Sequence, residues 1–352
     1  MLLEGIFSAV TTPFYPDGRL YLRKLEHNIG RYSRTPIAGL VVLGSTGEAV
    51  MLGDEETREV LRTARESGSA EKVLLAGVSR ESALETLKLA EFAAEQNYDA
   101  VLVRTPNYYS PQMRTLEMLT YFRVIADRSP LPVVLYNIPK FTHYDLQIEV
   151  IAELAQHPNI IGLKDSSGNV AHLAKIVEVT RSAPKRTTAV TNVFTAFTSR
   201  MLLDQPLEAS TFISADTLGT SATAVAVPPP RPKIATRTKE VGFQVLSGAA
   251  NQLKESLDSG ATGGVLAFAA FAPQACQEIY TAWKENDPKL AADKQQRIVE
   301  ASQSVVNQYG ISGVKFACDL NGYYGGRPRI PLLPLSGEEQ IYVTQLLADV
   351  RH

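Results

Sequence analysis

The sequence predicts an α/β fold, a (β/α)₈ TIM barrel with a C-terminal helical extension, and three observations lead to this fold class. Short apolar runs alternate with helical patterns, which is typical of βα units whose strands form a parallel sheet. There are eight such runs, the number of strands that closes a barrel of this kind. The chain of 352 residues is longer than the roughly 250 residues of a typical barrel, so an extension accounts for the remainder.

The predicted strands, in chain order, are the runs Gly5–Phe14, Gly39–Gly44, Lys72–Ser79, Ala100–Thr105, Pro132–Tyr136, Asn159–Lys164, Val241–Gly248 and Gly263–Phe271. Helical segments lie between them. The segment Asp54–Ser67 begins with acidic residues, which favour a helix N-terminus. In Ser82–Gln96 we expect a buried helical stripe. Its members are Leu84, Leu87, Leu89, Phe92 and Ala93.

The strand pattern stops after the eighth run, and only helical patterns follow it. We therefore expect the barrel in residues 1–272 and the helical extension in residues 273–352. The helical segments of the extension are Pro273–Asn286, Pro288–Tyr309, Gly313–Leu320 and Ser336–Val350.

One segment interrupts the alternation of strands and helices. Residues 182–239, between the sixth helix and the seventh strand, form an insertion of nearly 60 residues rich in Thr, Ala, Ser and Pro. Loops of this length without their own structure are uncommon in compact domains. Val190–Phe197 and Ala224–Val227 are candidates for strands or a small cap, and Pro228–Lys239 for an extended arm. A loop that leads into a barrel strand lies at the N-terminal face, so we expect a structural or oligomer-contact role; a gene-model artefact is the alternative.

Composition excludes several classes of function. A net charge of −2 gives no indication of a nucleic-acid or membrane surface, and the longest apolar stretch, Gly263–Pro273, is too short to span a bilayer. Two isolated cysteines and an N-terminus without a basic, apolar leader favour the reducing cytoplasm. The five histidines, His27, His143, His157, His172 and His352, form no ligand-spaced pair, so we expect no metal site.

The chemically informative residues are a lysine and a tyrosine at the ends of consecutive predicted strands. Lys164 closes the apolar run Asn159–Leu163, and Tyr136 closes the run before it. Burial disfavours the charged form of an amine, and a neutral amine can attack a carbonyl to form a Schiff base. The plainer interpretation is a lysine that reaches solvent from a strand terminus and a tyrosine that packs at the rim. The pairing of the two favours the chemical interpretation.

Two further strand ends carry polar or aromatic residues. The second run ends in the turn Gly44–Glu48, whose backbone amides can cradle a carboxylate, although an ordinary glycine-rich turn with a helix cap has the same sequence. The fourth run is followed by the aromatic pair Tyr108 and Tyr109. Because functional groups of TIM barrels lie at the C-terminal ends of the strands, these residues are expected to share one site with Tyr136 and Lys164.

With these motifs the chain resembles the dihydrodipicolinate synthase and N-acetylneuraminate lyase superfamily of pyruvate-dependent class I aldolases, outside roughly residues 182–239. The matching motifs are Thr11-Thr12-Pro13-Phe14, Gly44–Glu48, Tyr108-Tyr109, Tyr136-Asn137-Ile138-Pro139 and Gly162–Gly168. Within the superfamily it most resembles 4-hydroxy-2-oxoglutarate aldolase. The segments that carry this finer resemblance are Gln156–Ile160, Gly263–Val265 and the tail Gly322–Leu332.

The resemblance implies catalytic roles for four residues. Lys164 would form the Schiff base with pyruvate or with a longer 2-oxo acid, and Tyr136 would be the acid/base that relays protons. Ser45 stands where the family usually has threonine, and it would link Tyr136 to a second tyrosine. That second tyrosine would be Tyr108, donated across a subunit interface, so the resemblance also implies a homotetramer.

The resemblance implies substrate-binding positions as well. The amides of Ser45 and Thr46 would hold the substrate carboxylate, and Ser166 and Leu266 would contact the substrate. It implies no cofactor, and a small 2-oxo acid as the only partner besides further copies of the chain.

The chain departs from the dihydrodipicolinate synthases at one specificity position. Those enzymes have an arginine, two residues after the Tyr-Asn-X-Pro motif, that grips the carboxylate of the aldehyde partner; here Phe141 stands in its place and Lys140 before it. We therefore expect cleavage of 4-hydroxy-2-oxoglutarate or a similar acid to pyruvate and an aldehyde such as glyoxylate. The chain also departs from the 4-hydroxy-2-oxoglutarate branch at one position, because that branch commonly has serine where Asn137 stands. Open alternatives are condensation of pyruvate with aspartate semialdehyde, with Lys140 as a substitute clamp, a sugar-acid lyase or dehydratase, and a catalytically silent binding protein.

Overall fold

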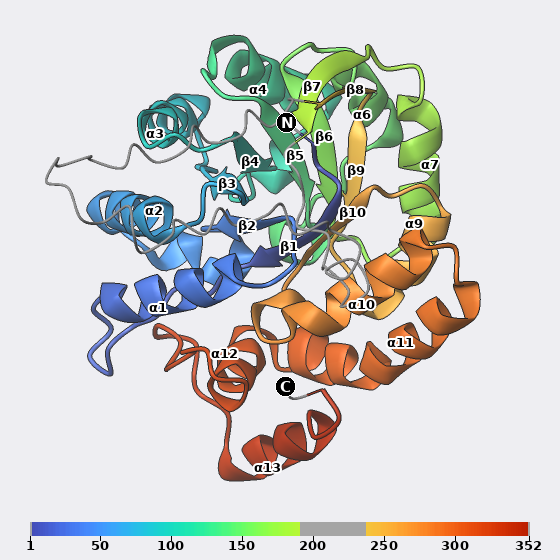
Figure 1. The fold of residues 1–352 in the computed structure, drawn as a ribbon. Helices are drawn as coiled ribbons and strands as arrows, with labels where there is room; N and C mark the ends of the chain where they lie inside the picture. The colour runs from blue at the N-terminus through green and yellow to red at the C-terminus, as the bar shows by residue number, and fades with distance from the viewer. Residues whose placement is uncertain (1, 191–236, 351–352) are drawn as a thin grey trace, which may run out of the picture.

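A closed barrel of eight parallel strands forms the centre of the molecule, as predicted (Figure 1). The computed structural model describes residues 2–190 and 237–350. Around the barrel the strands follow the order β1-β10-β9-β6-β5-β4-β3-β2, and β1 pairs with both β2 and β10 to close it. The strands are β1 (Gly5–Ala9), β2 (Gly39–Val42), β3 (Val73–Gly77), β4 (Ala100–Arg104), β5 (Val133–Asn137), β6 (Ile160–Asp165), β9 (Gln244–Ser247) and β10 (Gly263–Leu266). Six of them lie within one of the eight predicted apolar runs, and β5 and β6 each extend one residue beyond theirs, to Asn137 and Asp165.

Helices surround the barrel and alternate with its strands (Figure 1). They are α1 (Leu22–Ser33), α2 (Asp54–Ser67), α3 (Ala83–Glu95), α4 (Thr115–Arg128), the short α5 (Pro139–Thr142), α6 (Ile148–Leu154), α7 (Val170–Thr180), α9 (Leu253–Asp258) and α10 (Pro273–Lys284). The buried stripe expected on α3 is wrong at one position, because Leu84 is 62% exposed. It lies six residues from the buried Ala90, and at 3.6 residues per turn this places it about a third of a turn off the buried face.

The strands bury two faces because their side chains alternate between the barrel interior and the surrounding helices. The interior cluster includes Leu102 of β4 together with Val134 and Tyr136 of β5. The layer between strands and helices includes their sequence neighbours, such as Val103 and Leu135. This alternation determines which residue at each strand end faces the mouth of the barrel.

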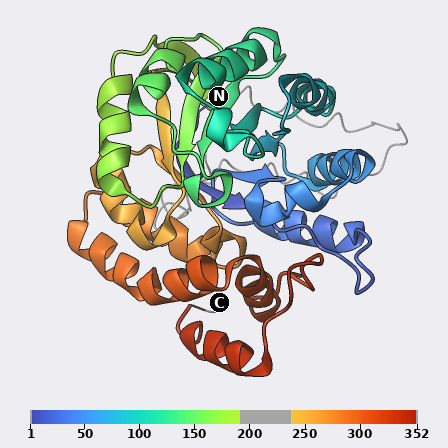
Figure 2. The same cartoon turned by 180° about the vertical axis from the view of Figure 1, so that it is seen from behind.

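The C-terminal helices lie together on one side of the barrel in both views, coloured orange to red (Figures 1 and 2). Helix α10 packs against β1. The predicted helix Pro288–Tyr309 is formed by α11 (Pro288–Ala301) and a π-helical segment (Ser302–Gln308). Helices α12 (Gly310–Leu320) and α13 (Gly337–Leu346) follow. No helix in the described ranges 2–190 and 237–350 is long and apolar enough to cross a membrane.

A buried ion pair joins the extension to the loop that follows β2. The Lys315 ammonium of α12 lies 2.5 Å from the Glu48 carboxylate, and both side chains are almost completely buried. Burial lowers the pKa of Lys315, whereas the Glu48 charge opposes this shift. Nearby, the Arg329 guanidinium contacts the Glu56 carboxylate of α2 at 2.7 Å. These contacts anchor the C-terminal segment at the mouth of the barrel.

The two ends of the insertion form an antiparallel ladder outside the barrel. Strand β7 (Arg186–Val190) pairs with β8 (Arg237–Val241). The Lys239 ammonium lies 3.0 Å from the carboxylate of Glu4, which directly precedes β1. The insertion therefore leaves and rejoins the described chain at the N-terminal end of the barrel, as expected. The candidate strands Val190–Phe197 and Ala224–Val227 and most of the arm lie outside the described residues.

Candidate active site

Lys164 and Tyr136 lie side by side at the C-terminal ends of β6 and β5. They are register partners in the parallel ladder, so their side chains leave the sheet on the same side. The Lys164 ammonium lies 4.1 Å from the centroid of the Tyr136 ring, and each residue is 4% exposed. Among the described residues, no carboxylate forms an ion pair with Lys164. A buried amine thus contacts a phenol ring without a neutralising partner.

Ser45 joins this pair from the turn that follows β2. The turn residues Ser45–Gly47 form a short 3₁₀ helix. The hydroxyl oxygens of Ser45 and Tyr136 lie 3.3 Å apart, within hydrogen-bonding distance. The backbone amides of Ser45 and Thr46 donate no hydrogen bond within the described part of the chain. Free amides at such a turn suit an anionic group, so the arrangement combines an amine, a phenol, a hydroxyl and an anion cradle.

A cavity of about 620 Å³ opens beside this group. Ser45 and Tyr136 line it, and so does Tyr108. Lys164 is not part of the cavity wall. Its ammonium lies against the ring of Tyr136, and Tyr136 does line the cavity. The C-terminal extension contributes Ile311 and Leu332 to the wall, and sequence reasoning missed both because the contact joins segments far apart in the chain.

Of the remaining predicted site residues, Tyr108 lines the cavity, whereas Thr46, Ser166 and Leu266 do not. Tyr108 is 77% exposed, and within the described part of a single chain it forms no hydrogen bond with Ser45 or Tyr136. Thr46 and the half-buried Ser166 are outside the cavity wall. The structure does not bring Leu266 to the cavity. Its side chain belongs to the layer between strands and helices, because the alternation along β10 gives the interior position to its neighbour Val265.

The substitute clamp considered for the aldehyde partner is directed away from the site. Lys140 donates a hydrogen bond from its ammonium to the carbonyl of Asn307 in the π-helical segment, at 2.9 Å. Phe141, in contrast, lines the cavity with a ring that is about half exposed. The position after the Tyr136 motif therefore presents an apolar wall to the cavity, as the sequence suggests.

A polar network holds the strand ends from the opposite side of the sheet. The Asn137 amide donates to the Asp165 carboxylate at 2.9 Å and to the Asp145 carboxylate at 2.7 Å. His172 lies 3.6 Å from Asp165, and this interaction raises the pKa of His172. Sequence reasoning missed this network. A usable signal was that Asn137 and Asp165 each follow a site residue and so face away from it.

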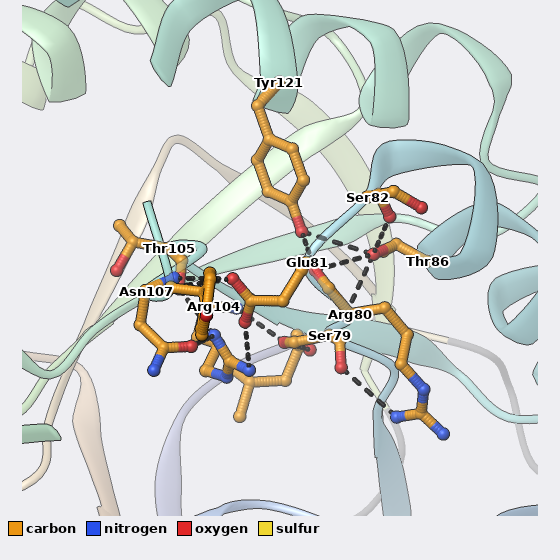
Figure 3. Close-up of polar contacts among 11 residues, drawn as sticks. Ser79, Arg80, Glu81, Ser82, Thr86, Arg104, Thr105, Asn107 and Tyr121 are labelled. Carbon is orange, nitrogen blue, oxygen red and sulfur yellow. Dashed lines mark hydrogen bonds and ion pairs between the residues drawn. The ribbon is translucent and has the colours of Figure 1, made fainter. Parts of the chain in front are cut away.

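A second group missed from the sequence surrounds the end of β4 (Figure 3). Arg104, the last residue of β4, lines the cavity and forms an ion pair with Glu81 at 3.0 Å. Arg80 also lines the cavity, but Figure 3 shows it extending away from Arg104; it contacts Asp54 and Thr57 of α2. The sequence signal for Arg104 was the alternation of side chains along the strand. Ala100 and Leu102 face the barrel interior, and Arg104 is the next residue in that alternation.

Similarity to known proteins agrees with this geometry. The profile of the Dihydrodipicolinate synthetase family matches residues 2–187 and 232–350, which leaves out the core of the insertion. A 4-hydroxy-tetrahydrodipicolinate synthase of Methanothrix thermoacetophila is 28% identical over 99% of this chain and 97% of its own length. An L-threo-3-deoxy-hexylosonate aldolase of Hypocrea jecorina is 26% identical over 99% of this chain and 95% of its own.

Solved structures share the fold. YagE of E. coli K12, a prophage protein of the dihydrodipicolinic acid synthase family crystallised with pyruvate, has a TM-score of 0.76 and 25% identity over 99% of both chains. Dihydrodipicolinate synthase DapA-2 of Bacillus anthracis has a TM-score of 0.78 and 22% identity over 100% of both chains. Because the family profile spans nearly all of the barrel and the extension, the chain belongs to the Dihydrodipicolinate synthetase family.

Proposed function

We propose that this protein is a class I aldolase that cleaves 4-hydroxy-2-oxoglutarate, or a similar 4-hydroxy-2-oxo acid, to pyruvate and an aldehyde such as glyoxylate. The observation that carries the proposal is the contact of the unpaired Lys164 ammonium with the ring of Tyr136, whose hydroxyl lies 3.3 Å from that of Ser45. An amine nucleophile with an adjacent proton-transfer group is what Schiff-base chemistry requires. Two buried thiols, Cys276 and Cys318, suit a reducing cytoplasm.

The reaction follows from these groups. The neutral amine of Lys164 attacks the keto carbon, C2, and the carbinolamine loses water to give an iminium ion. Tyr136 donates the proton with which the carbinolamine hydroxyl leaves as water, and the resulting phenolate accepts the proton of the C4 hydroxyl. The C3–C4 bond breaks, and its electron pair forms the C2=C3 double bond of an enamine. The aldehyde leaves, Tyr136 passes its proton to C3, and water hydrolyses the iminium ion, which releases pyruvate, frees Lys164 and restores the Tyr136 phenol. The water lost at the start is regained at the end.

The free amides of Ser45 and Thr46 are placed to bind the carboxylate next to the keto carbon. They follow β2, and the Ser45 hydroxyl lies beside the Tyr136 hydroxyl. A carboxylate there orients C2 toward Lys164 and C4 toward Tyr136, which replaces a bimolecular encounter with a fixed geometry.

The preference for a 4-hydroxy-2-oxo acid over aspartate semialdehyde rests on Phe141 and Lys140. Phe141 forms an apolar wall, and Lys140 is engaged with the Asn307 carbonyl. A charged hydrogen bond contributes roughly 1.5–3 kcal/mol, so the missing clamp is expected to cost about one to two orders of magnitude for aspartate semialdehyde. The named relatives include both a synthase of the dihydrodipicolinate pathway and a sugar-acid aldolase, so both remain alternatives for the test.

A turnover panel tests the choice of substrate. With pyruvate held constant, the protein should condense glyoxylate faster than aspartate semialdehyde or sugar-derived aldehydes, and pyruvate release should be fastest from 4-hydroxy-2-oxoglutarate. Phe141→Arg should raise kcat/KM for aspartate semialdehyde by about tenfold or more, because it restores a bidentate carboxylate partner. Efficient use of aspartate semialdehyde by the unmodified protein would instead assign it to dihydrodipicolinate formation.

We also propose that the active form is a homotetramer in which Tyr108 completes the site of a neighbouring subunit. Tyr108 is 77% exposed at the cavity and contacts Tyr109 edge-on, with ring centroids 5.0 Å apart. Tyr108 and Tyr109 thus expose two adjoining aromatic rings beside the cavity, and adjoining exposed apolar groups are typical of a contact surface. Sedimentation velocity at the assay concentration should show a tetramer, and Tyr108→Phe should reduce turnover without dissociating it. A fully active monomer is incompatible with this role.

A further inference from the structure

We propose that Arg104 binds the carboxylate carried by the aldehyde half of the substrate, and that Glu81 is the positioning residue that holds it there. The inference rests on the proposed aldolase function and deepens it: the preferred substrates are 4-hydroxy-2-oxo diacids whose second carboxylate is attached directly to C4, in contrast to the longer adduct of aspartate semialdehyde. Arg104 is a cation at the end of a barrel strand, and its register partner on the next strand is Tyr136.

The backbone places Arg104 on the same side as the reacting groups. Ala100 and Leu102 of β4 face the barrel interior, and because side chains alternate along a strand, Arg104 leaves β4 on that side as well. Its register partner is Tyr136, whose own partner on the next strand is Lys164. Neighbouring strands lie about 4.8 Å apart, so the Arg104 backbone is roughly 10 Å from that of Lys164.

A separation of roughly 10 Å between the backbones of Arg104 and Lys164 suits the end of the substrate that lies farthest from the keto carbon. The keto carbon is bonded to Lys164, the C4 hydroxyl is beside Tyr136, and the group attached to C4 continues toward β4. In 4-hydroxy-2-oxoglutarate that group is a carboxylate. The described lining of the cavity contains two cationic side chains, Arg104 and Arg80. Arg80 is directed to α2, where it contacts Asp54 and Thr57, which leaves Arg104 as the partner for an anion.

The guanidinium of Arg104 has unused donors. Its Nη1 donates to the Thr105 carbonyl at 2.8 Å and to Asn107 Oδ1 at 3.1 Å, and its Nη2 donates to Glu81 at 3.0 Å. A guanidinium has five N–H donors. The Nε–H and one Nη2–H therefore have no acceptor among the described residues, and a substrate carboxylate can accept from them.

Glu81 determines where the guanidinium lies. Its second carboxylate oxygen accepts from the backbone amides of Asn107 at 2.9 Å and Tyr108 at 3.0 Å, so Glu81 ties Arg104 to the loop that follows β4 (Figure 3). Burial alone would raise the pKa of Glu81, but the two amides and Arg104 together lower it. The carboxylate stays ionised and fixes one edge of the guanidinium while the other donors remain available.

The test compares two substrates that differ in one group. Pyruvate release is measured from 4-hydroxy-2-oxoglutarate and from 4-hydroxy-2-oxopentanoate, in which a methyl group replaces the far carboxylate. Arg104→Leu should reduce the preference for the diacid by about 10- to 100-fold, the range expected for a lost charged hydrogen bond. The loss should appear mainly in KM, because the carboxylate is bound equally before and during the reaction. Arg104→Lys should recover part of it.

Two further variants separate positioning from general damage. Glu81→Gln keeps the size of the side chain and should raise KM for the diacid with less effect on kcat and on the neutral substrate. Arg123→Leu is the matched control: Arg123 also pairs with a glutamate, Glu153, but on the outer helices α4 and α6, and both substrates should be unaffected. Arg104→Gln gives the same comparison should Arg104→Leu not fold.

Reduction with borohydride in the presence of pyruvate distinguishes the two levels of the proposal. If pyruvate is trapped on Lys164 but Arg104→Leu and Arg104→Gln leave the preference unchanged, the assignment of Arg104 is wrong while the aldolase function stands. If the parent protein traps pyruvate but does not prefer the diacid, the assignment of Arg104 is again wrong and the aldolase function again stands. If the parent protein traps no pyruvate, the proposed function itself fails.

Discussion

Lys164→Ala is expected to abolish aldol cleavage and the formation of a reducible adduct with pyruvate. The covalent intermediate requires an amine at this position, and a neighbouring phenol or hydroxyl cannot replace it. Loss of a nucleophile that acts as a unit with its acid/base partner reduces kcat by at least about 10⁴-fold. Pyruvate release under saturating substrate measures the rate, and mass spectrometry after borohydride reduction measures the adduct.

The adduct locates the nucleophile. In the parent protein the peptide that contains Lys164 should gain the mass of pyruvic acid less one oxygen atom, and trypsin should no longer cleave after the alkylated lysine. Lys140→Ala is the control, because Lys140 is near in sequence but donates to the Asn307 carbonyl; it should retain the adduct. An adduct on a different lysine would move the Schiff base elsewhere.

The fold of Lys164→Ala should remain intact. Among the described residues Lys164 forms neither an ion pair nor a hydrogen bond; its ammonium contacts the Tyr136 ring. Removing it therefore leaves no buried charge without its partner, in contrast to a lysine such as Lys315, which is paired with Glu48 at 2.5 Å. An unchanged melting temperature would attribute the loss of activity to the chemistry.

Much of the fold could be predicted from the sequence because strand and helix periods are local. Each of the eight apolar runs coincides with a barrel strand to within one residue at the strand's C-terminal end or contains it, and α2 has the predicted bounds Asp54–Ser67. Leu84 was wrong because the apolar pattern does not define the centre of the buried face. The insertion was recognised from its length, and its two ends pair as β7 and β8.

The site could be predicted only in part. Strand ends in consecutive βα units meet at one edge of a barrel, so the proximity of Tyr136, Lys164 and Ser45 followed from their positions in the chain. Whether a strand-end residue faces inward depends on the register, which a sequence shows poorly. Leu266 was therefore placed at the substrate and Arg104 was overlooked.

Contacts across the chain were beyond sequence reasoning. The pairing of Glu48 with Lys315 joins residues from opposite ends of the protein, and neither residue has a local pattern that indicates its partner. The contribution of Ile311 and Leu332 to the cavity has the same origin. Packing of the extension against the barrel mouth, and not any periodicity, determines these contacts.

Tyr136→Phe is expected to retain the fold and lose most of the activity. The substitution removes one hydroxyl and keeps the ring that contacts Lys164. A positioned acid/base typically contributes about 10²- to 10⁴-fold to the rate, and kcat for pyruvate release should fall within that range. KM should change little, because Tyr136 transfers protons in the transition states for imine formation and for C3–C4 cleavage and is not needed to bind the substrate. The Lys164 adduct with pyruvate should form more slowly but still be detected.

Tyr98→Phe provides the opposite pattern as a control. Tyr98 is buried, its hydroxyl donates to the Leu61 carbonyl at 2.8 Å, and neither residue lines the cavity. Its loss should lower the free energy of unfolding by about 1 kcal/mol and leave kcat unchanged. In Tyr136→Phe the only hydrogen-bond partner lost in the described residues is Ser45 at the cavity, where water can replace it, so stability should change less than in Tyr98→Phe. A rate within a few-fold of the parent protein would assign the proton transfer to another group, and the Ser45 hydroxyl would be the first to test.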